Sequence, residues 1–151
     1  MTANKGDSRI SIELKIPSVF GYEKIAMSTV ASIANEFGFS DDKIQDIKTA
    51  LSEACINAIE HGNELLEDRN VIVVFKVDDS GLIIDVIDEG HSRGFNLGHS
   101  PTLGDKLTEG IEKRGWGLFL IENLVDDVEL VKSDGASSLR MIIHFEQKRS
   151  D

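Results

Sequence analysis

Two apolar runs, VIVVFKV (71–77) and LIIDVID (82–88), lie only four residues apart in the sequence. Both are rich in β-branched residues, which favour strands. The residues between them, Asp78-Asp79-Ser80-Gly81, have the composition of a hairpin turn, so the two strands pair antiparallel. Both runs are apolar on both faces for most of their length, so we expect helices to cover the sheet.

The hydrophobic periodicity of the rest of the chain predicts the other strands and helices. In chain order we predict a strand at 10–16, helices at about 18–37 and 40–61, the hairpin, a helix at about 116–125, and a last hairpin at 128–132 and 138–146. This order predicts an α+β two-layer sandwich, with helices on one face of a mixed, mostly antiparallel sheet, rather than a doubly wound nucleotide fold.

The first two helices have recognisable ends. In the first helix we expect one apolar side, with Gly38 as its C-terminal stop; the residues of that side are Tyr22, Ile25, Ala26, Val30, Ile33 and Phe37. In the second, Ser40 is the expected N-cap. Its apolar stripe recurs at spacings of three and four residues (Ile44, Ile47, Leu51, Ala54 and Ala58). Gly62-Asn63 is expected to supply a left-handed exit.

Length and composition restrict the class of protein. The 151 residues predict one domain, at 8–147, with flexible ends at 1–7 and 148–151. A formal charge of −11 argues against nucleic acid as a partner. The single cysteine, Cys55, falls in an apolar helical pattern and is expected to be a core residue. No signal peptide or membrane span is visible, so we expect a soluble, cytoplasmic protein.

Three short segments contain residues suited to chemistry. Glu53 and Asn57 lie one helical turn apart, where they would suit a general base and a ligand for a hard cation. On spacing alone, a solvated surface pair is the better interpretation. Asp88-Glu89-Gly90 ends an apolar strand and could accept a hydrogen bond from an exocyclic amine, although any strand-to-turn junction has this composition.

The third segment, Gly115-Trp116-Gly117-Leu118, opens the predicted helix at 116–125, where free N–H groups and the helix dipole could attract an anion. Lys113 and Arg114 precede it and could add charge-assisted contacts. The stretch from Glu89 to Arg114 has five glycines and little periodicity, which is typical of a functional lid.

The order of these segments carries more information than any one of them. It resembles the superfamily of gyrases, Hsp90-type chaperones, histidine kinases and mismatch-repair ATPases. The stretch from Leu51 to Gly62, LSEACINAIEHG, is most similar to the anti-sigma factor serine kinases of that superfamily, as are GLFLI (117–121) and LVDDVE (124–129). The resemblance covers roughly residues 8 to 147.

The resemblance implies ATP and Mg²⁺ as ligands and gives each matching residue a role. Glu53 would help to activate the attacking hydroxyl and Asn57 would bind magnesium, while Asp88 would recognise the adenine amine with Gly90 beneath the ring. The other residues expected to contact the nucleotide are Gly94, Arg114, Gly115, Gly117, Leu118 and one of Ser137 and Ser138. The wider superfamily often has a glycine two residues after Gly90; this chain has Ser92 there, so its lid could close differently.

The resemblance therefore implies a serine/threonine protein kinase that phosphorylates a small anti-sigma-factor antagonist. Binding of a sigma factor and formation of a homodimer stay open, and neither nucleic acid nor membrane is expected as a partner. One alternative is a binding module in which nucleotide sets the conformation without phosphotransfer. Another is a detached ATPase domain of a sensor histidine kinase, against which the lack of a phosphoacceptor segment counts.

Overall fold

The computed structural model describes residues 10–66, 68–89, 111–133 and 136–146, with the backbone alone at 111–116 and 132–136. The elements are β1 (Ile10–Pro17), α1 (Glu23–Glu36), α2 (Asp41–Asn57), a π-helical turn η1 (Ala58–Gly62), β2 (Asn70–Val77), β3 (Gly81–Asp88), α3 (Ile111–Leu124), β4 (Asp127–Ser133) and β5 (Ala136–His144). The flexible ends predicted at 1–7 and 148–151, and most of the predicted lid, lie outside the described residues.

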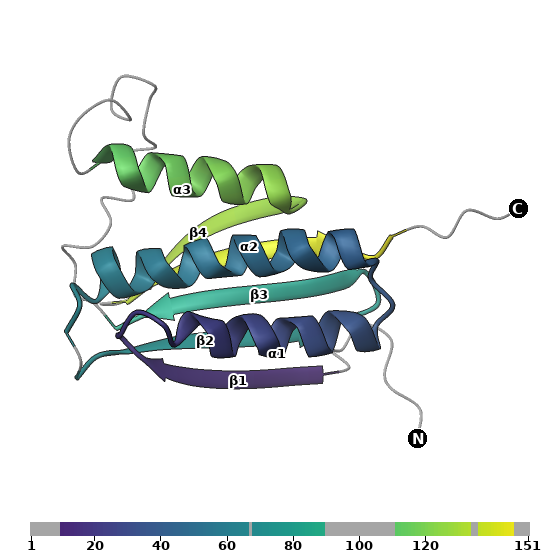
Figure 1. Ribbon diagram of the computed structural model, residues 1–151, viewed down its shortest axis with the longest axis horizontal. Coiled ribbons are helices and arrows are strands. Elements are labelled where there is room, and N and C mark those ends of the chain that lie inside the picture. The colour runs from purple at the N-terminus through teal and green to yellow at the C-terminus, as the bar shows by residue number, and fades with distance from the viewer. Residues whose placement is uncertain (1–9, 67, 90–110, 134–135, 147–151) are drawn as a thin grey trace, which may run out of the picture.

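The described strands form one sheet in the order β1-β2-β3-β5-β4, and all four pairings are antiparallel. β2 and β3 form the hairpin predicted from the sequence, and the Asp78 carboxylate closes its turn by accepting hydrogen bonds from the Ser80 and Gly81 N–H groups at 2.8 and 3.1 Å. The predicted α+β sandwich is confirmed, but the described strands form an antiparallel sheet and not the mixed one that was predicted. β4 and β5 form a second hairpin, added beside β3 through β5 (Figure 1).

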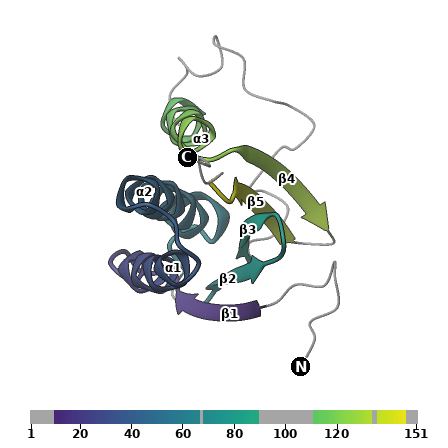
Figure 2. The same cartoon turned by 90° about the vertical axis from the view of Figure 1, so that its right-hand side faces the viewer.

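The three helices lie on one face of the sheet, with α2 between α1 and α3 (Figures 1 and 2). The stripe on α2 is buried as predicted, since Ile47 and Leu51 have no exposed surface. It packs within a core that also contains Val30 of α1, Phe75 of β2 and Met141 of β5. No helix in the described ranges is both long and apolar enough to cross a bilayer.

The start of α1 differs from the prediction. The helix begins at Glu23 because the chain first makes a turn at Gly21, whose φ of +108° favours glycine. The buried Glu23 carboxylate accepts a hydrogen bond from the Gly21 N–H at 2.6 Å. Consequently Tyr22 and Ile25, predicted on the buried side, are 43% and 47% exposed.

None of the described helices lies on the opposite face of the sheet (Figure 2). Its centre holds an ion pair in which the Arg140 guanidinium donates to both carboxylate oxygens of Asp85, at 2.7 and 3.0 Å. Asp85 is only 7% exposed, and the bidentate pairing satisfies a charge that would be costly to bury alone. Outward-facing residues of β2 and β3 such as Val74 and Ile83 are half-buried around it, so helices cover only one of the two apolar faces that the sequence showed.

The N-terminus of α2 is capped twice. The Ser40 hydroxyl accepts from the Lys43 N–H at 3.2 Å, as predicted. The Ser40 N–H donates to the Glu146 carboxylate at 2.8 Å, which lowers the pKa of Glu146. Glu146, which follows β5 by two residues, is thereby joined to the helix that carries the core stripe.

We predict that this second cap weakens in acid. A carboxyl whose pKa is lowered on folding stabilises the fold above its ordinary pKa of 4.5, and the contribution is lost as the pH falls through the lowered value. Glu146→Gln should therefore lower the urea midpoint near neutral pH and leave it close to that of the unmodified protein in acid. Glu36→Gln, the same change at an exposed position of α1, is the control; equal effects of the two variants would refute the cap.

Cys55 lies in the core as predicted and has no exposed surface. Burial, and to a smaller extent the Glu23 charge, raise the pKa of its thiol to about 12. Because the thiolate is the reactive form, we predict that iodoacetamide leaves the folded protein unmodified at neutral pH and labels it stoichiometrically in urea. Intact-mass measurement checks this, and rapid labelling of the native protein would show that α2 opens readily.

Candidate functional site

Glu53 and Asn57 lie on α2 where α3 crosses it. A β-carbon added to Gly117 of α3 would lie 2.9 Å from Asn57 Nδ2 and 3.4 Å from Glu53 Oε2. The backbone of α3 thus lies close to both side chains at Gly117, and closest to Asn57. Glu53 is half-buried and Asn57 only 9% exposed, so the interpretation as a solvated surface pair is wrong.

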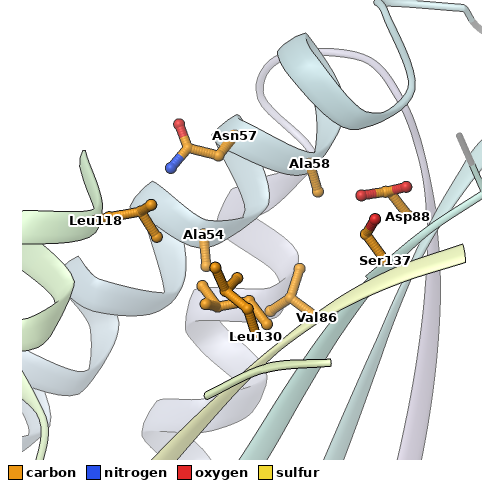
Figure 3. Close-up of a pocket in the computed structure, with 9 residues that line it drawn as sticks. Ala54, Asn57, Ala58, Val86, Asp88, Leu118, Leu130 and Ser137 are labelled. Carbon is orange, nitrogen blue, oxygen red and sulfur yellow. The ribbon is translucent and has the colours of Figure 1, made fainter. Parts of the chain in front are cut away.

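A pocket with about 310 Å³ of empty space, its open mouth included, begins at Asn57 and extends toward the end of β3 (Figure 3). Its lining comes from α2, α3 and the sheet: Ala54, Asn57, Ala58, Val86, Asp88, Leu118, Leu130, Ser137 and Leu139. Most of these side chains are apolar, and the polar ones lie at two separate places.

Asp88 lies at one end of this pocket, as the last residue of β3. It is 3% exposed and pairs across the sheet with Ser137 of β5. In Figure 3 the Asp88 and Ser137 side chains lie together at one end, while Asn57 lies toward the other. The pocket therefore has two polar ends separated by an apolar surface.

Ser137 and Ser138 face opposite sides of the sheet because adjacent strand residues alternate. Ser137 is aligned with Asp88 and lines the pocket, whereas Ser138 is aligned with Ile87. Of the two candidates, only Ser137 lies in the pocket. Ser138 lies on the opposite face of the sheet from the pocket.

The glycine-rich segment before α3 differs from the prediction. The helix begins at Ile111 rather than near Trp116, so Gly115 and Gly117 lie inside it and not at its first turn. The first N–H groups of the helix, which have no partner within it, belong to residues 111–114, a segment that includes Arg114. Leu118 lines the pocket. Gly90 and Gly94 lie outside the described residues.

The sequence analysis missed several pocket residues. Val86 could have been found, because it is two residues before Asp88 on the same strand and must face the same side. Leu130 and Leu139 are directly paired across the β4–β5 hairpin, and no motif distinguishes them from core residues. Gly62, which lies behind Asp88 and does not line the pocket, was also missed: a β-carbon there would lie 2.5 Å from Asp88 Cγ.

The donor set of the pocket suits some ligands better than others. In the described part of the chain, no three His, Cys, Asp or Glu side chains are grouped to hold a metal ion. A cation here would thus depend on one or two oxygens, such as those of Asn57 and Glu53, together with oxygens of a ligand. An apolar surface with a buried carboxylate at one end suits a flat ring with an N–H donor at its edge.

Comparison with known protein families and solved structures agrees with this fold. The model of the histidine kinase-like ATPase domain matches residues 21–143, which is most of the chain. Among solved structures, the RsbU and RsbW domains of Rv1364c from Mycobacterium tuberculosis superpose with a TM-score of 0.62 at 19% identity, over 89% of this chain and 31% of that one. At that identity the likeness supports the fold alone.

Curated relatives are more similar in sequence. The chain is 37% identical to proteins named serine-protein kinase RsbW from Bacillus cereus (strain AH820) and Bacillus anthracis (strain A0248). Each alignment spans 145 residues, which is 93% of this chain and 89% of the relative. The family model and these alignments each cover most of the chain, which confirms the resemblance seen in the motifs: this chain belongs to the histidine kinase-like ATPase domain family.

Proposed function

We propose that this protein is an ATP-dependent serine-protein kinase that phosphorylates a serine of a small anti-sigma-factor antagonist. The observation that carries the proposal is the position of Glu53 and Asn57 together beside Gly117, with Asn57 lining the pocket whose other end holds Asp88. A site for adenine alone would need only the Asp88 end. The RsbW relatives, named serine-protein kinases, support this activity.

The two ends of the pocket bind different parts of the nucleotide. In the proposal the Asp88 carboxylate accepts a hydrogen bond from the exocyclic amine of adenine, with Ser137 beside it and apolar residues against the ring. The phosphates extend toward Asn57 and α3. In the proposal Arg114, Gly115 and Gly117 contact the phosphates, Gly90 would lie beneath the base, and Gly94 belongs to the predicted lid.

Magnesium fits the end of the pocket at Asn57, because the Asn57 carboxamide supplies a hard oxygen next to where the phosphates would lie. Asn57 would hold the ion, which neutralises phosphate charge when bound. Glu53 orients the serine hydroxyl and takes its proton as Oγ attacks the γ-phosphorus. The bond from that phosphorus to the bridging oxygen breaks, and ADP leaves with the bonding electrons.

The proposal extends to partners and setting. The substrate is a folded protein that presents a serine, and a sigma factor is a second partner that the kinase would sequester. The charge of −11 favours partners with a basic face and disfavours nucleic acid. A reducing, cytoplasmic setting agrees with the single buried thiol of Cys55. The mass of the protein in solution would distinguish a homodimer from a monomer.

The adenine role of Asp88 is tested by base preference. Asp88→Asn should weaken ATP binding by roughly 1–3 kcal/mol, the scale for leaving a buried polar partner mismatched. GTP, which lacks an amine at that edge, should bind weakly to both proteins. Titration calorimetry with ATP and GTP measures this, and Asp42→Asn, an exposed change on α2, is the control. Equal affinity of the unmodified protein for ATP and GTP would remove the adenine assignment.

The catalytic roles are separated by two substitutions on α2. Glu53→Ala should bind Mg-ATP almost normally yet transfer phosphate about 10²–10⁴-fold more slowly, the range for a positioned general base. Asn57→Ala should lose magnesium-dependent binding as well, because a cation ligand acts in the ground state and in the transition state alike. The assay follows labelled phosphate from ATP to the antagonist, and Glu36→Ala on α1 is the matched control.

Two outcomes would contradict this assignment. Equal transfer by Glu53→Ala and the unmodified protein would show that Glu53 is not the base. Binding of the antagonist without transfer of label by either protein would replace the kinase with a nucleotide-dependent binding module.

A further inference from the structure

We propose that Gly62 and Asn63 are positioning residues for base recognition: together they set where the Asp88 carboxylate points in the pocket. The inference rests on the proposed nucleotide function and adds to it two residues at the end of the central helix, neither of which lines the pocket.

Gly62 is required because a side chain would not fit at this position, and not because the backbone needs a positive φ. Among the described glycines only Gly21 and Gly38 have a positive φ, so Gly62 does not make the left-handed exit that its sequence suggested. A β-carbon at Gly62 would instead lie 2.5 Å from Cγ and 2.7 Å from Cβ of Asp88, closer than real contacts allow. The Gly62 backbone therefore forms a wall against the Asp88 side chain and excludes some of its rotamers.

The π-helical turn η1 places the Gly62 backbone next to the end of β3. α2 continues without a break into η1, where the Asn63 N–H donates to the Ala58 carbonyl at 2.8 Å, a spacing of five residues. A π turn places its residues differently from an α-helix and is frequent at functional sites. The left-handed residues come afterwards, at Glu64 and Leu65 with φ of 55° and 60°, which is unfavourable for side chains of their kind. Contacts around the turn must hold this backbone in place.

Asn63 supplies such contacts. It has no exposed surface, and its amide nitrogen donates to Ser18 Oγ at 2.8 Å and to the Asn70 carbonyl at 2.9 Å. Its amide oxygen accepts from the Glu89 N–H at 2.9 Å. Glu89 directly follows Asp88, so Asn63 fixes the peptide group on the C-terminal side of the recognition carboxylate. One side chain thus joins the helix exit, the start of β2 and the end of β3.

These contacts predict a specific defect. If Gly62 and Asn63 orient Asp88, disturbing them should reduce the preference for ATP over GTP and raise KM for ATP. The rate at saturating ATP should change little, because Glu53 and Asn57 act at the other end of the pocket. A purely structural role would lower stability and leave the base preference unchanged.

The first test is Gly62→Ala, with Gly38→Ala as the matched control. Both add one methyl group; at Gly38 nothing lies within 4 Å, and the strain comes from its φ of +82° alone. Gly62→Ala should weaken ATP binding about tenfold to a hundredfold, the cost of a misplaced contact group, and bring the ATP and GTP affinities together. Gly38→Ala should lower only the melting temperature.

A second pair keeps the test decisive if Gly62→Ala does not fold. Asn63→Ala removes the acceptor for Glu89 and should reduce the base preference. Ser18→Ala removes only a hydroxyl on the far side of Asn63, whose amide still donates to Asn70, and should keep the preference. A folded Gly62→Ala or Asn63→Ala protein with the ATP-to-GTP ratio of the unmodified protein would overturn the inference. An unmodified protein that shows no such preference would overturn the adenine assignment itself, and the inference with it.

Discussion

Burial of α2 between its two neighbouring helices and the sheet is the constraint on which the rest of the structure depends. Ile47 and Leu51 lose all contact with water there, and each buried side chain of this size contributes about 1.5–3 kcal/mol. The same helix carries Glu53 and Asn57 on the side that faces α3. Because one rigid element supplies both the core stripe and the polar pair, the pair cannot move without disturbing the core.

The pocket is assembled by segments far apart in the chain. Asn57 and Asp88 come from α2 and β3, and Ser137 arrives through the pairing of β5 with β3. Antiparallel register decides which side chains face the helices, so a shift of one residue in β5 would exchange Ser137 for Ser138. The Asp85–Arg140 pair on the uncovered face aligns the same two strands and opposes such a shift. An ion pair outside the pocket thereby helps to define the pocket.

The fold could be predicted largely from periodicity. Alternation at 10–16 and the close spacing of 71–77 and 82–88 identified β1 and the hairpin, because these patterns depend on local geometry alone. The starts of α1 and α3 could not be predicted so well. The first depends on a turn at Gly21, and the second on a glycine-containing segment that is helical although glycine is a poor helix former.

The residues of the candidate site could likewise be predicted only in part. Glu53, Asn57 and Asp88 were identified because their residue types and order resemble a family, while spacing alone favoured a surface pair for the first two. Leu130 and the choice between Ser137 and Ser138 depend on register across β4, β5 and β3, which a single sequence does not contain. The role of Gly62 depends on a distance between η1 and β3 that only the folded chain creates.

Two glycines lie beside polar side chains of the pocket, and neither has a positive φ. Gly117 lets α3 approach Asn57 and Glu53, and Gly62 lets η1 approach Asp88. At each end a polar side chain thus lies against the main chain of a glycine. Main chain inside a helix moves only with the whole helix, so the direction of both polar groups follows from the packing of α2 and α3 on the sheet. Orientation of the polar groups and stability of the core therefore have the same physical origin in this protein.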